Sequence, residues 1–438
     1  CILKCVEHQY CQQDASLEFP KGFLWGASTS AHQVEGGNTN DWSEWEKKNA
    51  QRLASEAAAR FGTLPNWKDI SQEASNPDNY ISGLACDHYR RFKDDFALAK
   101  KLGHNATRFS IEWSRVEPEE GVFDTSAIDH YREVLQTCRA NGLKPFVTLW
   151  HWSTPLWISQ SGGWENPRTI EKFLKYTERL ADEYKDLIKF WMPLNEPGTY
   201  VGMSYIQGAF PPQKRLALFS ANRVFKNLMK AHRGAYRTIH QKVPDACVGL
   251  SHYAVFMRAS RESFWNKRLI QILDYYRNWR FLDSVDDAND FIGIQYYHAD
   301  VITFMPRMNG RWGFIDAKSA GSWTTDMGWD VVPEGMYYLL KRVAAYRKPI
   351  YITENGIAAR NDRARERFIR ENLRDVLQAV TEGVDVRGYF YWSLLDNFEW
   401  DKGFWPRFGL VEIDFKTMER KPRSSAYAYQ KIIAQNSL

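Results

Sequence analysis

The stretch FWMPLNEPGTY, residues 190–200, is an apolar run that ends in a charged residue. Its first half, Phe190 to Leu194, has the composition of a buried strand, and Asn195, Glu196 and Pro197 follow directly. A carboxylate at the end of a buried strand costs free energy unless it is hydrogen-bonded, paired with a cation or open to a cleft. Glu196 is therefore either part of a structural ion pair or a residue placed there for chemistry.

Runs of the same kind occur eight times along the chain. Most are nearly continuously apolar, which is typical of parallel strands covered on both faces. The predicted strands are residues 23–28, 104–111, 144–150, 190–196, 247–253, 290–297, 349–354 and 388–395. Amphipathic segments between them predict helices over 87–102, 126–141, 168–189, 220–243, 333–346 and 363–383. The alternation predicts an α/β fold, a single (β/α)8 TIM barrel, over residues 19–438 of the 438-residue chain.

Two long insertions enlarge the βα loops of this predicted barrel. Residues 38–86 include an expected extra helix within 44–61, and residues 298–332 separate the sixth and seventh strands. Both insertions lie on the side where a barrel builds its active site, so they either decorate the barrel or shape access to its pocket. Residues 1–18 read as an irregular N-terminal extension, in which Cys1, Cys5, Cys11 and His8 leave a metal or disulfide clip as a less favoured alternative.

The composition narrows the class of partner. Hydrophobic residues make up 44% and charged residues 25% of the chain, and the net charge of +5 is spread along it. This balance points to neither nucleic acid nor a membrane surface, and no apolar run approaches the ~20 residues of a membrane span. The first residues lack the long apolar stretch of a secretory signal, so we expect a cytoplasmic protein. The sequence leaves open whether it forms a homo-oligomer.

Polar and aromatic residues gather at the same end of nearly every predicted strand. They are Gln33 and Glu35 after the first strand, Arg108 in the second, His151 and Trp152 after the third, Asn195 and Glu196 at the end of the fourth, Gln295 and Tyr296 in the sixth, Glu354 at the end of the seventh, and Trp392, Asn397, Glu399 and Trp400 in and after the eighth. In a barrel, the carboxyl ends of the strands form the catalytic face. The pattern therefore predicts one shared pocket.

Two carboxylates stand out in this pocket. Glu196 and Glu354 end the fourth and seventh strands, which face each other across a closed barrel. Cleavage of a glycosidic bond needs such a pair, because one carboxyl group must hold a proton for the leaving oxygen while the other attacks the anomeric carbon. The alternative is that both are structural ion pairs with Arg108 or another base. Aromatic residues make up 15% of the chain, with 18 Trp, which fits either a Trp-rich core or a cleft that stacks on sugar rings.

These residues lie in motifs that resemble glycoside hydrolase family 1, the β-glucosidase and β-galactosidase group. The resemblance covers nearly the whole chain. Its motifs are FPKGFLWGASTSAHQVEGG (19–37), RFSIEWSR (108–115), TLWHWSTPLWI (148–158), LNEP (194–197), GWDVVPEG (328–335), YITENG (351–356) and NFEWDKGFWPRFGL (397–410). The resemblance implies a TIM barrel and a retaining mechanism, in which Glu196 is the acid/base and Glu354 is the nucleophile.

The resemblance also implies roles for other residues. Those expected to bind the sugar or its leaving group are Gln33, His151, Trp152, Asn195, Tyr296, Trp329, Trp392, Glu399 and Trp400, with Trp164 as a further candidate for the leaving-group wall. Arg108 and the hydroxyl of Tyr296 are expected to support the ionised nucleophile, because a cation and a hydrogen-bond donor both favour a charged carboxylate. No cofactor is expected, since neither a nucleotide-binding glycine motif nor a zinc motif is present.

The sequence departs from the family pattern at two positions near the site. Pro193 stands where a Thr is usual, and Gln295 where an Asn is usual, so we expect small shifts in geometry rather than a loss of activity. Glu399 would repel a phosphate, which points away from phosphorylated sugars. The expected activity is exo-hydrolysis of β-D-glucosides, and of β-galactosides and β-fucosides, as small molecules or short oligosaccharides. The alternatives are a transglycosidase with the same catalytic pair and a non-catalytic sugar-binding relative.

Overall fold

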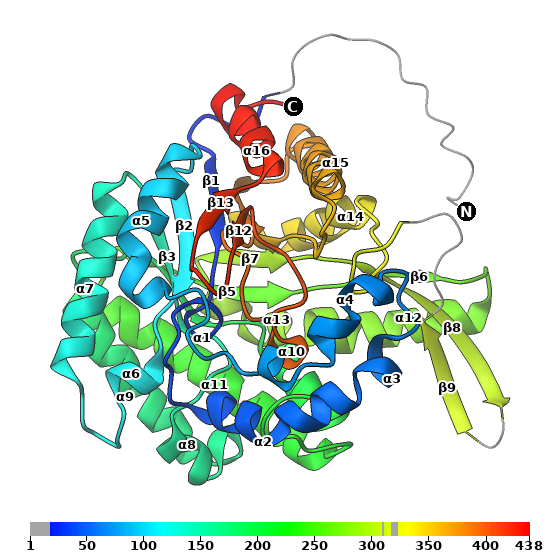
Figure 1. Ribbon diagram of the computed structural model, residues 1–438, viewed down its shortest axis with the longest axis horizontal. Coiled ribbons are helices and arrows are strands. Elements are labelled where there is room, and N and C mark those ends of the chain that lie inside the picture. Colours follow the sequence, from blue (N-terminus) through cyan, green and yellow to red (C-terminus); the bar gives the residue numbers. More distant parts are fainter. Residues whose placement is uncertain (1–17, 309–310, 317–322) are drawn as a thin grey trace.

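The computed structural model describes the backbone of residues 18–308, 311–316 and 323–438, and the side chains of 18–304 and 323–438. Eight parallel strands close into a barrel in the order β1-β11-β10-β7-β5-β4-β3-β2 (Figure 1). These are β1 (Leu24–Ser28), β2 (Ala106–Ser110), β3 (Lys144–Trp150), β4 (Phe190–Leu194), β5 (Cys247–Tyr253), β7 (Phe291–Gln295), β10 (Ile350–Asn355) and β11 (Val386–Trp392). The predicted fold and all eight predicted strands are confirmed.

The six predicted helices are also present. They are α5 (His88–Lys101), α7 (Thr125–Ala140), α9 (Arg168–Tyr184), α11 (Leu218–Lys242), α14 (Glu334–Val343) and α15 (Asp362–Thr381). Gly103 ends α5 with a φ of +82°, a left-handed conformation that glycine adopts without a steric penalty. Helix α9 ends five residues earlier than predicted, because residues 185–189 form the turn that leads into β4.

The lower interior of the barrel is a packed apolar plug. Seven of the eight strands each contribute one side chain to it: Leu24, Ala106, Phe146, Met192, Phe291, Tyr351 and Phe390. The ring of Phe146 packs against two other aromatic rings of this plug: its centroid lies 4.8 Å from that of Phe390 and 5.1 Å from that of Tyr351. A Cβ at Gly26 would lie 2.3 Å from the carbonyl oxygen of Ala106, so only glycine allows β1 to approach β2 this closely. Because the plug fills one end, the pocket can open only at the carboxyl ends of the strands.

The first insertion forms more helices than predicted. Residues 38–86 contain α2 (Asp41–Ser55), α3 (Ala57–Phe61), α4 (Trp67–Ala74) and the 3-10 turn η1 (Pro77–Tyr80), so the single helix expected within 44–61 is broken at Glu56. Asn40 and Ser43 form a capping box at the start of α2. The Asn40 side chain accepts from the backbone N–H of Ser43, and the Ser43 hydroxyl accepts from the backbone N–H of Asn40. Local capping thus fixes where this helix begins.

The second insertion forms a small sheet outside the barrel. Strands β8 (Ala299–Met308) and β9 (Arg311–Asp316) make a hairpin, and β8 pairs with β6 (Phe256–Ala259), which follows β5 (Figure 1). Helix α12 (Phe264–Asp274) packs on this sheet through Leu269, Ile270 and Leu273, which meet Met257 and Ile302. This sheet differs from the prediction, in which residues 298–332 were only an enlarged loop.

Several predictions fall at the N-terminus. Residues 1–17, including Cys1, His8, Cys5 and Cys11, lie outside the described residues. Glu18 pairs with Ser437, and the backbone N–H of Phe19 donates to the carbonyl of Asn436.

The cysteines that the structure describes, Cys86, Cys138 and Cys247, are free thiols. Within the described part of the chain, no helix combines the length and the apolar character that crossing a bilayer requires.

Candidate active site

Glu196 lies in a tight turn between β4 and the short helix α10 (Pro197–Val201). Its backbone has φ +40° and ψ +57°, and its N–H donates to the carbonyl of Ser251 on β5 at 2.8 Å. Pro197 suits the first position of the helix, where a backbone N–H has no intrahelical partner. The apolar run of β4 and the proline that follows therefore fix Glu196 just beyond the end of the strand, where it is 6% exposed.

Glu354 lies within β10 and is surrounded by hydrogen-bond donors. One NH₂ group of Arg108, a fully buried side chain on β2, donates to Oε1 of Glu354, and the hydroxyl of Tyr297 donates to Oε2 at 2.5 Å. The other NH₂ group of Arg108 donates to Oδ1 of Asn195 at 2.6 Å, next to Glu196. One guanidinium thus links the ends of β10 and β4, as the predicted strand-end pattern requires.

The two carboxyl groups interact electrostatically but not equally. Burial raises the pKa of Glu196 well above its usual range, and the negative charge of Glu354 raises it further. Burial also raises the pKa of Glu354, but Arg108, Tyr297 and Gln295 all act to lower it. A proton shared by the pair therefore prefers Glu196, and the negative charge prefers Glu354.

The alternative reading, two structural ion pairs, fits only one of the two residues. Glu354 is paired with Arg108. In the described part of the chain, Glu196 makes no ion pair with Lys, Arg or His, so it is a buried carboxyl group without a cation of its own. A buried carboxyl group without such a partner favours its protonated form, which is the form a proton donor needs.

Asn195 and His151 form the next part of the pocket. Oδ1 of Asn195 accepts from Arg108 and from Gln295, so its Nδ2 is the end that meets Nε2 of His151 at 3.0 Å. Burial, with Arg108 nearby, holds the pKa of His151 well below its usual range. The neutral ring accepts at Nε2 and carries its proton on Nδ1, which has no partner among the described residues. Both side chains thus keep an N–H group for a ligand hydroxyl.

Gln33 and Glu399 lie next to each other and form a second group of hydrogen-bonding side chains. Nε2 of Gln33 donates to the carbonyl of Phe398 at 2.7 Å and reaches Oε2 of Glu399 at 3.5 Å, while Oε1 accepts from Ser30. Burial raises the pKa of Glu399 to about 8. Two hydroxyl donors from a sugar would favour the ionised form of this carboxyl group, which accepts them well.

The predicted aromatic residues surround these polar groups. Trp152 donates from its indole to the carbonyl of Asn195 at 3.0 Å, and its ring lies 5.0 Å from that of Trp400. The His151 ring is roughly parallel to Trp400 at 6.0 Å and to Trp392 at 6.2 Å. Trp329 is partly exposed and lies 6.0 Å from the ring of Tyr297. Flat apolar faces therefore flank the hydrogen-bonding groups, as sugar binding requires.

The prediction that the Tyr296 hydroxyl supports Glu354 is wrong. Tyr296 is buried outside the pocket, and its hydroxyl donates to the carbonyl of Val332 at 2.5 Å. Successive residues of an extended chain point to opposite sides, and Gln295 points into the pocket toward Asn195. The side chain two residues on, Tyr297, therefore faces the same way and reaches Glu354. The alternation of the predicted strand was the signal that could have identified it.

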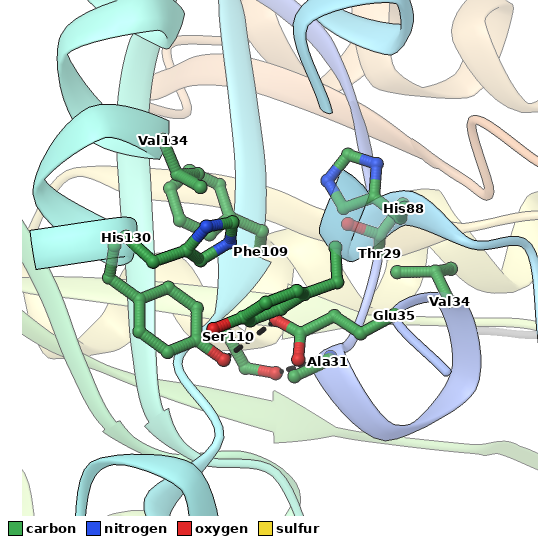
Figure 2. A pocket seen from close by; sticks show the side chains of 11 residues that line it. Thr29, Ala31, Val34, Glu35, His88, Phe109, Ser110, His130 and Val134 are labelled. Carbon is green, nitrogen blue, oxygen red and sulfur yellow. Dashed lines mark hydrogen bonds between the residues drawn. The ribbon is translucent and has the colours of Figure 1, made fainter. Parts of the chain in front are cut away.

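Two other candidates also lie outside the pocket. Glu35 accepts from the Tyr131 hydroxyl at 2.8 Å and from Nε of Arg115 at 2.9 Å, and it borders a cavity with room for about one water molecule. Figure 2 shows it among Thr29, His88 and His130 at that cavity. Trp164 is completely buried against Trp150, with ring centroids 5.1 Å apart. Both have structural surroundings rather than access to a ligand.

The described residues hold no group of three His, Cys, Asp or Glu side chains that could bind a metal ion. The site instead combines Glu196, whose burial favours the protonated form, Glu354, which is held by a guanidinium and a hydroxyl, the N–H groups of Asn195 and His151, and aromatic faces. This set can donate a proton on one side of a bound molecule and present a nucleophile on the other.

Comparisons with known proteins agree with this chemistry. The model of glycosyl hydrolase family 1 matches residues 15–284 and 280–438. Beta-glucosidase A of Thermotoga maritima is 31% identical, over 96% of this chain and 99% of that protein. The beta-glycosidase from Pyrococcus horikoshii superposes with a TM-score of 0.85 at 36% identity, covering 97% of this chain and 96% of its own. The beta-glucosidase from Thermotoga maritima in complex with glucoimidazole gives a TM-score of 0.84 at 29% identity, covering 96% of this chain and 100% of its own.

Proposed function

Because the chain belongs to glycosyl hydrolase family 1, we propose that it is a retaining, exo-acting β-glycosidase that hydrolyses O-glycosides by double displacement. The observation that carries the proposal is the unequal pair: Glu354 is held by Arg108 and Tyr297, while Glu196 forms no ion pair within the described residues and its pKa is raised well above the usual range. The unequal surroundings assign the proton-donor role to Glu196 and the nucleophile role to Glu354.

In the first step, Glu196 gives its proton to the glycosidic oxygen while an Oε atom of Glu354 attacks the anomeric carbon. The bond from that carbon to the leaving oxygen breaks, and an ester bond to Glu354 forms. The negative charge of Glu354 is consumed, so the interaction that raised the pKa of Glu196 disappears. Glu196 can then accept a proton from water, which attacks the same carbon and releases Glu354.

The remaining residues hold the sugar in place. Asn195 keeps an N–H group for the 2-hydroxyl beside the reacting carbon, a contact that strengthens in the transition state. His151 offers Nδ1–H, and Glu399 with Gln33 accepts and donates to vicinal hydroxyls. A carboxylate and an amide side by side can bind either orientation of a 4-hydroxyl, so β-glucosides, β-galactosides and β-fucosides are the proposed substrates. Trp392 and Trp400 supply the apolar faces.

The two carboxyl groups can be tested separately. Glu354→Ala should abolish hydrolysis, and azide should restore turnover with an α-glycosyl azide as product, because azide then attacks from the face that Glu354 occupied. Glu196→Ala should still act on dinitrophenyl β-glucoside, whose leaving group needs no proton, and should be nearly inactive on cellobiose. Circular dichroism should show that both variants are folded.

Two results would contradict the proposal. One is near-normal activity of either variant on cellobiose. The other is a first-formed product with the α configuration when the wild-type reaction is followed by nuclear magnetic resonance, because double displacement at a β-glycoside returns the β anomer.

A further inference from the structure

Exposed apolar side chains are concentrated in two short segments of the surface. Thirteen large hydrophobic residues are exposed among the described residues, and eight of them lie within 216–219 and 264–276. They are Leu216, Leu218, Phe219, Phe264, Trp265, Ile272, Tyr275 and Tyr276. Single exposed apolar residues are ordinary, but a cluster of eight marks a surface that meets an apolar partner.

The first segment is held rigidly. Phe219, in the first turn of α11, is 93% exposed. The residues just before it are fixed by backbone hydrogen bonds, from Leu216 to the carbonyl of Ile206 at 3.0 Å and from Ala217 to that of Tyr205 at 2.8 Å. The structure therefore presents Phe219 to solvent on an ordered turn.

The second segment is a helix that leaves part of its apolar side exposed. Helix α12 packs on the outer sheet through Leu269, Ile270 and Leu273. On the same side, Trp265 stacks on Phe304 at 5.7 Å yet is 61% exposed, and Ile272 is exposed as well. The exposed apolar residues continue into Tyr275 and Tyr276 of the π-helix η4 (Tyr275–Trp279). The apolar stripe of this helix is therefore wider than the surface that the described residues of the outer sheet cover.

Arg280 connects the two segments. It donates to Asn222 of α11 at 3.1 Å, and its guanidinium lies 5.4 Å from the ring centroid of Tyr276 and 4.3 Å from that of Phe225. Both segments follow the carboxyl ends of barrel strands, β4 and β5, so they lie on the side that carries Glu196. We call residues 213–230 and 258–280 together the aromatic–basic face.

The charge of this face is strongly positive. Its two segments contain eleven Lys or Arg and only two Asp or Glu, a net charge of +9, whereas the whole chain has +5 and the remainder therefore −4. Among its cations, Lys214 pairs with Glu165 and Arg277 with Asp300, both acids from outside the two segments. The even spread of charge assumed from the total does not hold in the folded chain.

We propose that the aromatic–basic face binds an anionic lipid surface. Trp and Tyr side chains favour the interface between water and lipid, and Lys and Arg beside them are attracted to anionic headgroups. A second copy of this chain, joined by two-fold symmetry, would bring the same net positive charge against itself, which disfavours a dimer through this face.

Sedimentation with lipid vesicles tests the proposal directly. The full chain should bind vesicles of phosphatidylcholine with about 30% phosphatidylglycerol, and should bind pure phosphatidylcholine at least about tenfold more weakly. The double variant Phe219→Ser, Trp265→Ser should bind the anionic vesicles about tenfold or more weakly than wild type. Lys226→Gln with Arg268→Gln should lose about fivefold per charge.

Matched substitutions elsewhere supply the control. Val122 and Tyr427 are 53% and 45% exposed and lie outside the face, so Val122→Ser with Tyr427→Ser should bind like wild type. All variants should retain wild-type turnover of a water-soluble aryl glucoside.

Three outcomes would overturn the proposal: no binding to anionic vesicles, equal loss in the control variant, or a wild-type dimer in analytical ultracentrifugation that Phe219→Ser and Trp265→Ser convert to monomer. The last would assign the face to a second copy.

Discussion

Replacing Tyr297 by Phe removes one hydroxyl group, which donates a 2.5 Å hydrogen bond to Oε2 of Glu354. A hydrogen bond to a charged group contributes about 1.5–3 kcal/mol. Because Arg108 still donates to the other oxygen, the lower half of this range applies. One pKa unit corresponds to about 1.4 kcal/mol, so the loss should raise the pKa of Glu354 by about one unit.

The direction of the pH effect follows from the role of Glu354. The nucleophile must be ionised, so activity falls as the pH drops through its pKa. A donor to the carboxylate favours the ionised form, and removing it raises that pKa. The acid limb of the kcat/KM profile should therefore move to higher pH by about one unit, and activity on the acidic side of the limb should fall about tenfold.

The neighbouring tyrosine provides the matched control. Tyr296→Phe removes the same atom from the next residue, but its hydroxyl donates to the carbonyl of Val332 and not to Glu354. The buried carbonyl loses a partner, which should lower the free energy of unfolding by about 1 kcal/mol and the Tm by about 1 °C. Its pH profile should match that of the wild type.

The assay is kcat/KM for nitrophenyl β-glucoside across the pH range, because this parameter reports the pKa values of the free enzyme. A shifted acid limb in Tyr296→Phe would refute the assignment. So would an unshifted limb in Tyr297→Phe, which would mean that the Tyr297 hydroxyl does not stabilise the ionised nucleophile.

Three further results are expected. The pKa of Glu399 is raised from 4.5 to about 8, so its contribution to folding stability is complete below pH 4.5 and is lost as the pH rises through 8. Glu399→Gln should therefore have a higher Tm than wild type at about pH 9, while its KM for β-glucosides rises. The same Tm difference between the variant and wild type at about pH 4.5 and at about pH 9 would contradict the raised pKa. Glu35→Gln leaves Arg115 without its buried partner and should lower the free energy of unfolding by about 2 kcal/mol in urea titrations. Its kcat and KM should be unchanged, and a large loss of kcat would place Glu35 in the site after all. Trp329→Ala should raise KM for aryl β-glucosides about tenfold with little change in kcat, since it removes a face and no reacting group; a drop in kcat alone would argue against a wall for the leaving group.

The barrel could be predicted from the sequence because its signal is repeated. Eight apolar runs separated by amphipathic segments leave few other architectures, and an error of a few residues at one strand does not alter the pattern. The outer sheet of β6, β8 and β9 has no such redundancy. It consists of three strands that pair outside the barrel, and its position depends on contacts with α12 that no local pattern encodes.

The site could be predicted to the level of strand ends but not always to the level of a side chain. Glu196, Glu354 and Asn195 come together because the closed barrel brings all strand ends into one ring. After the sixth strand, Tyr296 and Tyr297 are adjacent, and only one of them can point toward Glu354. The prediction named Tyr296, whereas Tyr297 points into the site. Glu35 failed for a related reason: it follows the first strand, but its turn carries it outward to Arg115.

The same residue type plays two roles at Glu196 and Glu354 because the backbone places them differently. Glu354 is still part of β10, in register with Gln295, so its side chain lies among donors from the strands beside and across from it. Glu196 lies one step past β4 in a left-handed turn, tied by its N–H to Ser251, and its carboxyl group forms no ion pair with an Arg of the described part of the chain. Arg108 donates to Glu354 and to Asn195 rather than to Glu196, so its charge lowers the pKa of Glu196 only through space, and burial outweighs that effect. The position of a single turn relative to the end of a strand thus decides which carboxyl group keeps the proton.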